Sequence, residues 1–306
     1  MFYSCYSLIY VKCLATGLSG ENCLKEWMTD VSSQGTFVKA ANAQWPTGTS
    51  GIPEGWTVEN ASSASQYLTF SSRGTTTVSL TNVGNNAPVL YYSTDAQTWT
   101  QWDYSGLTFT ADAPLYICGD NPQGFGTGNS SFRMSGDNVA VSGDIMSLIN
   151  KDQAVTVIPS ASCFYGLFYQ CSALVSAPEL PATTLTEYCY YNMFYGCSNL
   201  IEAPELPATT LAPWCYGQMF AACTSLVTAP NLPAETLVNA CYYHMFQNST
   251  SLEYVTCMAT DISADEATTT WLEDVAATGT FVKAPNSQWP IGSSGIPQGW
   301  TVENAL

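Results

Sequence analysis

Cysteine is the residue whose spacing first suggests chemistry, because a C-x7-C pair recurs in three successive segments 26 residues apart. Such pairs could bind a metal or form disulfides, but the chain has no CxxC pair and a single histidine, which disfavours zinc. A residue that recurs with the repeat points the same way each time, and cysteine is often buried. We therefore expect ladders of buried free thiols, with no metal and no cofactor. We call residues at the same position in successive repeats a column. The cysteines form two columns, Cys163/Cys189/Cys215/Cys241 and Cys171/Cys197/Cys223, and Ser249 continues the second.

Nucleophilic catalysis would need His244, the single histidine, beside a nucleophile and an orienting acid. His244 aligns with Gly166, Asn192 and Gln218 of the preceding repeats, and a column this variable is typical of the surface. We expect no catalytic residues and predict that the chain is not an enzyme.

Paired carboxylates can hydrolyse glycosides, and Glu179, Glu202 and Glu205 fall near predicted repeat strands. They recur or vary with the repeat as a solvated face does. The segment STDAQTW at 93–99 resembles the Asp-box hairpin of sialidases, but it lacks the glycine and one spacer residue. Sialidases also depend on three arginines, whereas this chain has two. We predict a hairpin here, and a carbohydrate-active enzyme is only a distant alternative.

Aromatic side chains carry the most functional promise, because Tyr and Trp combine flat apolar faces with a hydrogen-bonding group. Such rings suit contacts with sugars and with protein surfaces. The alternative is that tyrosines at the repeat spacing pack inside the fold. The candidate binding residues are Trp99, Trp102, Tyr104, Tyr190, Tyr191, Tyr216, Tyr242 and Tyr243.

The charge of the chain excludes several partners. A formal net charge of −17 with only seven basic residues disfavours nucleic acid, whose phosphates need Lys and Arg, and disfavours anionic membrane surfaces. No apolar run approaches the roughly 20 residues that span a bilayer, so we expect no membrane insertion. With 46% hydrophobic and 13% aromatic residues, the chain is expected to fold.

The elements that position these residues repeat with two periods. At an offset of 244 residues, GTFVKA at 35 matches GTFVKA at 279, and Met1 matches Met245. The sequence therefore indicates an excerpt of a longer tandem array, so neighbouring copies of the module are expected partners. The shorter period of 26 residues lies within the roughly 20 to 29 residues of leucine-rich repeats, whose rungs bury their apolar faces only by stacking.

The segment MFYGCSNLIEAPELPATTLTEYC carries a family resemblance. It is similar to the BspA-type leucine-rich repeats of bacterial surface proteins, of the Bacteroidales cell-surface or phage tail-fibre type, through F-x-x-C-x-x-L followed by L-P. The repeats here are longer and carry an extra proline. The resemblance covers residues 160–256 well, and it implies an extracellular location on a bacterial cell surface or phage virion.

Residues 62–154 differ from the repeats, because eight strand-length alternating runs separated by turn residues predict a β-sandwich. The two related segments 16–61 and 259–306 each predict an amphipathic helix followed by two short strands, TFVKA and GWTVEN. Ser263 and Glu266 could form a capping box there. We expect these segments to cap the open end of a solenoid formed by residues 155–258, with 1–15 ending a preceding solenoid.

The predicted fold class is α+β or mostly β. It combines a leucine-rich-repeat solenoid with 26-residue rungs and α/β caps with an antiparallel β-sandwich domain. The expected function is that of a non-catalytic extracellular repeat module of an adhesin or fibre, which binds a glycan or protein on a host cell surface. A purely structural spacer or stalk module is the main alternative.

Overall fold

The computed structural model describes residues 10–13, 27–39, 45–48, 51–60, 66–83, 87–111, 113–125, 130–136 and 138–305. They form two compact units, residues 1–65 and 66–306. Some predictions concern residues outside the described ones. These are Met1, most of the predicted end of a preceding solenoid in 1–15, and the first part of the predicted helix in 16–61.

The first unit contains a parallel three-stranded sheet in the order β1 (Tyr10–Cys13), β2 (Thr36–Lys39) and β3 (Thr57–Asn60). Alternation in these strands directs Phe37 of β2 into a small core beside Trp27 and Trp56. The indole of Trp27, which precedes β2, donates to the carbonyl of Gly51, which precedes β3, at 2.9 Å.

The second unit begins with two sheets that pack through Phe70 and Phe132, whose rings are 5.2 Å apart. The larger sheet has the order β12-β11-β4-β9-β6-β7, and the smaller has the order β10-β5-β8. The larger sheet is mixed, because β11 and β12 are parallel. The strands are β4 (Leu68–Ser71), β5 (Thr76–Thr81), β6 (Leu90–Ser93), β7 (Thr100–Gln101), β8 (Leu107–Phe109), β9 (Leu115–Gly119), β10 (Ser131–Ser135), β11 (Val139–Ser142) and β12 (Leu174–Ser176).

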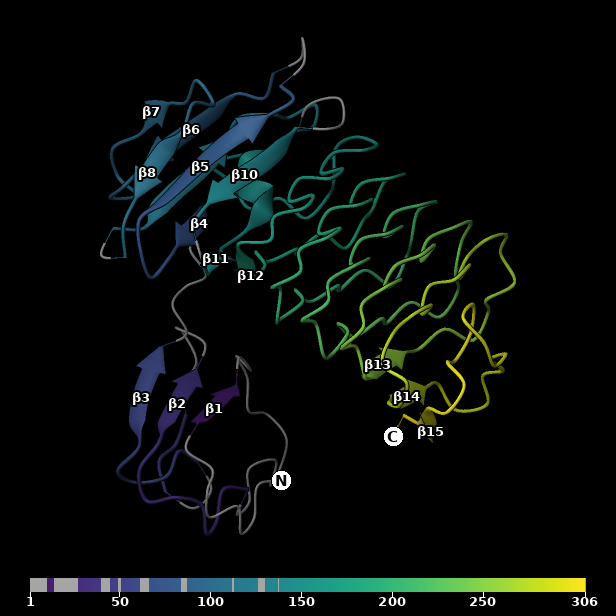
Figure 1. Cartoon of the computed structure of the whole chain (residues 1–306). Helices are drawn as coiled ribbons and strands as arrows, with labels where there is room; N and C mark the ends of the chain where they lie inside the picture. Colours follow the sequence, from purple (N-terminus) through teal and green to yellow (C-terminus); the bar gives the residue numbers. More distant parts are fainter. Residues whose placement is uncertain are drawn as a thin grey trace. The chain divides into compact units, whose positions relative to one another are not determined.

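Between β12 and β13 (Tyr254–Cys257) the chain runs through successive similar turns, coloured teal to yellow-green in Figure 1. In residues 162–171, and in the equivalent residues of the following repeats, every second backbone amide donates to the next repeat. Phe168, for example, donates to Met193 at 2.9 Å. The amides between them donate three residues back, as Leu167 does to Phe164. Each repeat therefore divides its backbone bonds between itself and its neighbour.

The last part of the second unit is a parallel sheet of β13, β14 (Thr280–Lys283) and β15 (Thr301–Asn304), with the same order and register as the sheet in the first unit. Trp271 donates to Gly295 at 2.9 Å, as Trp27 does to Gly51. The strands predicted from TFVKA and GWTVEN are confirmed. So are the eight predicted runs between residues 67 and 142, which all contain a strand.

The predicted fold class is wrong. The described residues contain no α-helix, since their single helical element is the 3-10 turn η1 (Ile145–Leu148), and their sheets form neither a closed barrel nor a leucine-rich-repeat solenoid. Hydrogen bonding explains the failure of the predicted helix after residue 260. The carbonyls of Ala267 and Trp271 accept amides of the preceding repeat, and Glu266 and Thr270 have positive φ, which breaks a helix.

The predicted capping box is likewise absent, because the Ser263 hydroxyl donates to Asp261 and not to the turn that follows. The division of residues 62–306 into three domains stays a prediction. Buried side chains from all three segments, such as Phe70, Phe194 and Phe281, belong to one continuous hydrophobic core. Within the described part of the chain, no helix has the length and apolar character needed to cross a membrane.

Candidate functional site

Four of the eight predicted binding residues lie in the core. Tyr190, Tyr216 and Tyr242 are at most 2% exposed and form a continuous stack, with ring centroids about 6 Å apart. Phe164 extends this stack at one end and Trp271 at the other. Trp102 is buried against Phe132. These four side chains are packed inside the fold, as the alternative of internal packing expects, and none of them presents its ring at the surface.

Five other rings of the repeats are half-buried and lie close together, from the position one residue after the buried stack and the position two residues before it. We call the group Tyr165, Tyr188, Tyr191, Trp214 and Tyr243 the aromatic surface. Tyr165 stacks on Tyr191 at 5.2 Å, and Tyr188 stacks on Trp214 at 5.6 Å. Tyr191 and Trp214 are 6.0 Å apart, and Trp214 and Tyr243 are 4.9 Å apart. Side chains from four successive repeats thus form one connected cluster.

Amide side chains connect the phenol groups of the aromatic surface. Gln218 donates from Nε2 to the Tyr191 hydroxyl at 2.5 Å, and Asn192 donates to the Tyr165 hydroxyl at 3.4 Å. Burial raises the pKa of Tyr191 to about 12, so its hydroxyl keeps its proton at neutral pH. The surface therefore offers ring edges together with neutral hydroxyl and amide groups.

Two of these rings sit on an unusual backbone. Tyr188 and Trp214 have φ of 56° and 58°, a left-handed conformation that is uncommon for bulky residues. Ser162 and Ala240 occupy the same column with the same conformation. The repeat thus fixes the backbone conformation of this column, whether its side chain is small or aromatic.

Sequence reasoning found Tyr191 and Tyr243 but missed Tyr165, Tyr188 and Trp214. For Tyr165, the signal that could have found it is its spacing of 26 residues from Tyr191. Tyr188 and Trp214 lie in another column, which Ser162 and Ala240 share, so no recurring aromatic marks their position. The remaining predicted residues lie elsewhere. Trp99 contacts Tyr67 at 4.5 Å.

Tyr104 is also separate from the aromatic surface, since its hydroxyl donates to the Pro88 carbonyl at 2.6 Å. The segment at 93–99 does form the predicted hairpin between β6 and β7. Asp95 accepts from the amides of Thr98 and Gln97, which lower its pKa. The hairpin uses its aspartate to organise the turn.

The residues considered for catalysis differ in their burial. His244 is half-buried, burial lowers its pKa from the ordinary 6.5, and its Nδ1 hydrogen-bonds to Thr270. The nine described cysteines are buried free thiols, as expected. Glu179, Glu202 and Glu205 are exposed. In the described part of the chain, no cluster of three or more His, Cys, Asp or Glu side chains could hold a metal ion.

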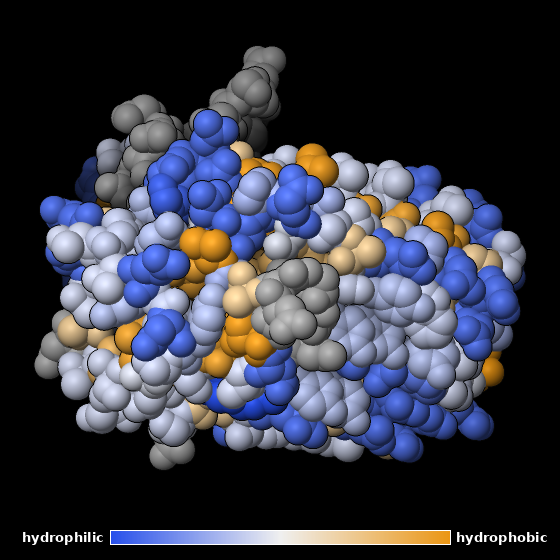
Figure 2. Space-filling view, turned by 90° about the horizontal axis from the view of Figure 1, so that it is seen from above, coloured by the Kyte–Doolittle hydropathy of each residue, from blue (hydrophilic) through white to orange (hydrophobic). Residues whose placement is uncertain are grey.

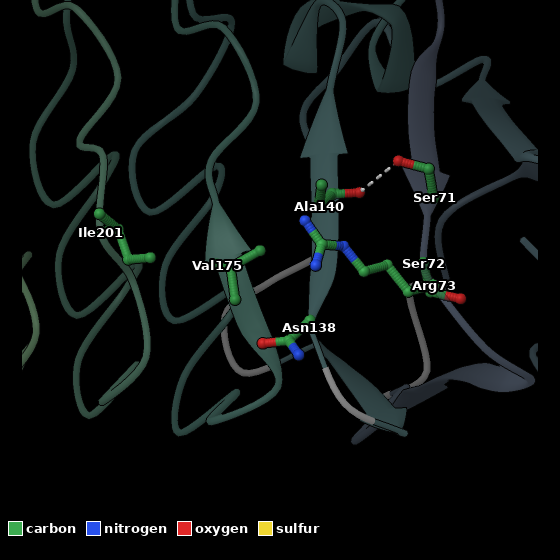
Figure 3. A pocket seen from close by; sticks show the side chains of 7 residues that line it. All are labelled: Ser71, Ser72, Arg73, Asn138, Ala140, Val175 and Ile201. Carbon is green, nitrogen blue, oxygen red and sulfur yellow. Dashed lines mark hydrogen bonds between the residues drawn. The ribbon is translucent and has the colours of Figure 1, made fainter.

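A second candidate is an open groove where the larger sheet meets the repeats, with a volume of about 410 Å³. Figure 3 shows Arg73 extended over β11 with its guanidinium directed toward Val175 of β12, and Ile201 of the next repeat beyond it. Asn138 and Ala140 also line the groove. Ser71 donates from its hydroxyl to the Ala140 carbonyl at 3.5 Å.

Hydrophobic residues on the face shown in Figure 2 form small patches separated by polar ones. Comparison of the chain with protein-family models, curated proteins and solved structures finds no match in any of the three.

Proposed function

We propose that this chain is a non-catalytic, extracellular repeat module of an adhesin or fibre, on a bacterial cell surface or a phage virion. Its aromatic surface contacts a glycan or a protein on a host cell. The observation that supports this proposal is the aromatic surface itself, a cluster of five half-buried rings held by four repeats.

The composition of the aromatic surface supports binding for a physical reason. Tyr and Trp bury a large area while losing few rotamers, and they dominate the energetics of many interfaces. Trp214 is central, because it contacts Tyr188, Tyr191 and Tyr243. Stacking holds these rings in place before any ligand arrives, which lowers the entropic cost of association.

Glycan and protein arrays probed with the whole chain test the proposal. We expect Trp214→Ala to weaken binding of the selected ligand about thirtyfold, the effect of losing about 2 kcal/mol at an interface. Tyr195→Ala is the matched control, because Tyr195 is half-buried and stacks on Tyr169 at 5.1 Å outside the aromatic surface. Equal losses for the two variants, or no binding to either array, would contradict the proposal.

A structural spacer is the second candidate. The continuous buried stack from Phe164 to Trp271 favours it, because such a stack stiffens the repeats whether or not a ligand binds. If the chain is a structural spacer, the wild-type chain should bind neither the glycan array nor the protein array at high concentration. Trp214→Ala should then change only the stability of the chain.

A further inference from the structure

The groove beside β11 differs from the aromatic surface in its chemistry. It contains no aromatic ring and combines one guanidinium, from Arg73, with the amide of Asn138, nearby hydroxyls and an aliphatic side formed by Val175 and Ile201. Its volume of about 410 Å³ lies in the lower part of the about 300 to 1,000 Å³ typical of small-molecule sites. The groove is therefore suited to one small, partly polar ligand.

Among the described residues of the second unit, Arg73 differs from the other basic side chains in its contacts. Residues 66–306 contain four basic side chains, and three have partners within the protein. Lys151 pairs with Asp152, Lys283 donates to Ser287, and Arg133 donates to backbone carbonyls of Phe132 and Tyr169.

Arg73 has no ion pair or hydrogen bond to a described residue, and it is exposed at the groove. A guanidinium binds a carboxylate with two parallel hydrogen bonds. In a chain with a net charge of −17, one such group favours a small anion over an extended polyanion.

We propose that this groove binds a single acidic sugar, either free or at the end of a glycan. Arg73 holds the carboxylate, Asn138 hydrogen-bonds to ring hydroxyls, and the aliphatic side packs against the C–H face of the ring. The site is separate from the aromatic surface, so this proposal does not depend on the function proposed above.

The repeats supply a matched pair of variants for testing the groove. Val175, Ile201, Val227 and Glu253 occupy the same position in four successive repeats, so the chain already carries a glutamate in this column. Ile201 is 59% exposed and lines the groove, whereas Val227 is 41% exposed and does not. A glutamate at either position is expected to leave the fold intact, but only Ile201→Glu places a carboxylate near Arg73.

Nuclear magnetic resonance titration of the isotopically labelled whole chain tests the proposal, with glucuronate and glucose as probes. The two sugars differ by a carboxylate in place of a hydroxymethyl group. We expect glucuronate to bind with a Kd on the order of 1 mM, the strength typical of a ligand of this size, and to shift amide signals around Arg73. Glucose should bind at least tenfold more weakly.

The variants then locate the site. Arg73→Gln and Ile201→Glu should each weaken glucuronate binding at least tenfold, whereas Val227→Glu, Lys151→Gln and Trp214→Ala should leave it unchanged. Equal binding of glucose, unchanged binding by Arg73→Gln, or amide shifts away from the groove would overturn the proposal. Binding of N-acetylvaline as tight as that of glucuronate would also overturn it, because the groove would then recognise a carboxylate without the sugar ring.

Discussion

The hydroxyl of Ser249 donates a 2.8 Å hydrogen bond to the carbonyl oxygen of Phe220 in the preceding repeat. Cysteine thiols make the same bond in the other repeats, from Cys223 to Phe194 and from Cys197 to Phe168, each at 3.1 Å. This column therefore requires a small buried donor, and sulfur is not essential to it.

The two cysteine columns should respond differently to serine. Cys223→Ser keeps the donor to Phe194 and should change the free energy of unfolding by less than about 1 kcal/mol. Cys215 is equally buried, but its thiol has no such bond to a described residue, so Cys215→Ser should cost about 1 to 3 kcal/mol by burying an unpaired hydroxyl. Urea denaturation measures the free energy of unfolding of both variants. Equal effects would contradict the conclusion that only the column of Cys223 requires a hydrogen-bond donor.

The thiols also predict a loss of stability at alkaline pH. Burial raises the pKa of Cys163 to about 11 and that of Cys189 to about 12, from an ordinary 9.0. Above pH 9 the unfolded chain loses these protons while the folded chain keeps them, so their contribution is complete below pH 9 and disappears as the pH rises toward 11 to 12.

Denaturation midpoints between pH 7 and pH 11 measure this loss. Burial also raises the pKa of Cys197 and of Cys223, so a control in which these two cysteines are replaced by serine should show a smaller decline. At pH 8, iodoacetamide should modify the nine described cysteines only after denaturation, as read by mass spectrometry. Rapid labelling of the native chain at Cys189 or Cys215 would show that the thiols are accessible.

The amino-acid sequence predicts the sheets of this protein better than its repeats. Alternating runs such as TTVSLT of β5 bury every second residue, so periodicity locates them directly. The repeats obey a different rule, because their amides bond alternately to the next repeat and to the residue three positions back. No single hydrophobic period describes this backbone, which is why the expected strand-and-helix rungs are absent.

The candidate site was predictable only in part for the same reason. The rings at Tyr190 and Tyr191 have the same residue type and the same spacing, yet one is 1% exposed and the other is half-buried. Composition cannot separate them without the backbone conformation. The groove was still harder to find, since Arg73 and Ile201 are 128 residues apart and meet only because β12 pairs with β11.

The left-handed residues of the repeats predict a reciprocal pair of effects. Ala222 and Gly196 occupy the same column, with φ of 58° and 70°. Glycine adopts this conformation without a Cβ penalty, so Ala222→Gly should stabilise the chain by about 0.5 to 1 kcal/mol. Gly196→Ala should destabilise it by about 1 kcal/mol, because the new Cβ would also lie 3.2 Å from Gln170 Cγ. Thermal unfolding of the two variants measures the pair, and shifts of the same sign would contradict it.

The buried tyrosine stack predicts a stabilising substitution. The hydroxyl of Tyr190 is buried without a hydrogen-bond partner among the described residues, whereas Phe164 fills the same position one repeat earlier. Tyr190→Phe removes the unpaired group and keeps the ring, so the free energy of unfolding should rise by about 1 to 2 kcal/mol. Tyr191→Phe is the matched control, since it deletes the acceptor of Gln218 and should give no gain.

Urea denaturation of both tyrosine variants compares them under the same conditions, with an unchanged slope showing that the folded state is the same. A loss of stability in Tyr190→Phe would mean that its hydroxyl has a partner in solution, such as a bound water. In that case the stack would be held by hydrogen bonding as well as by ring packing. A gain would show that the Tyr190 hydroxyl contributes nothing to the stack, and that ring packing against Phe164 and Tyr216 holds Tyr190 in place.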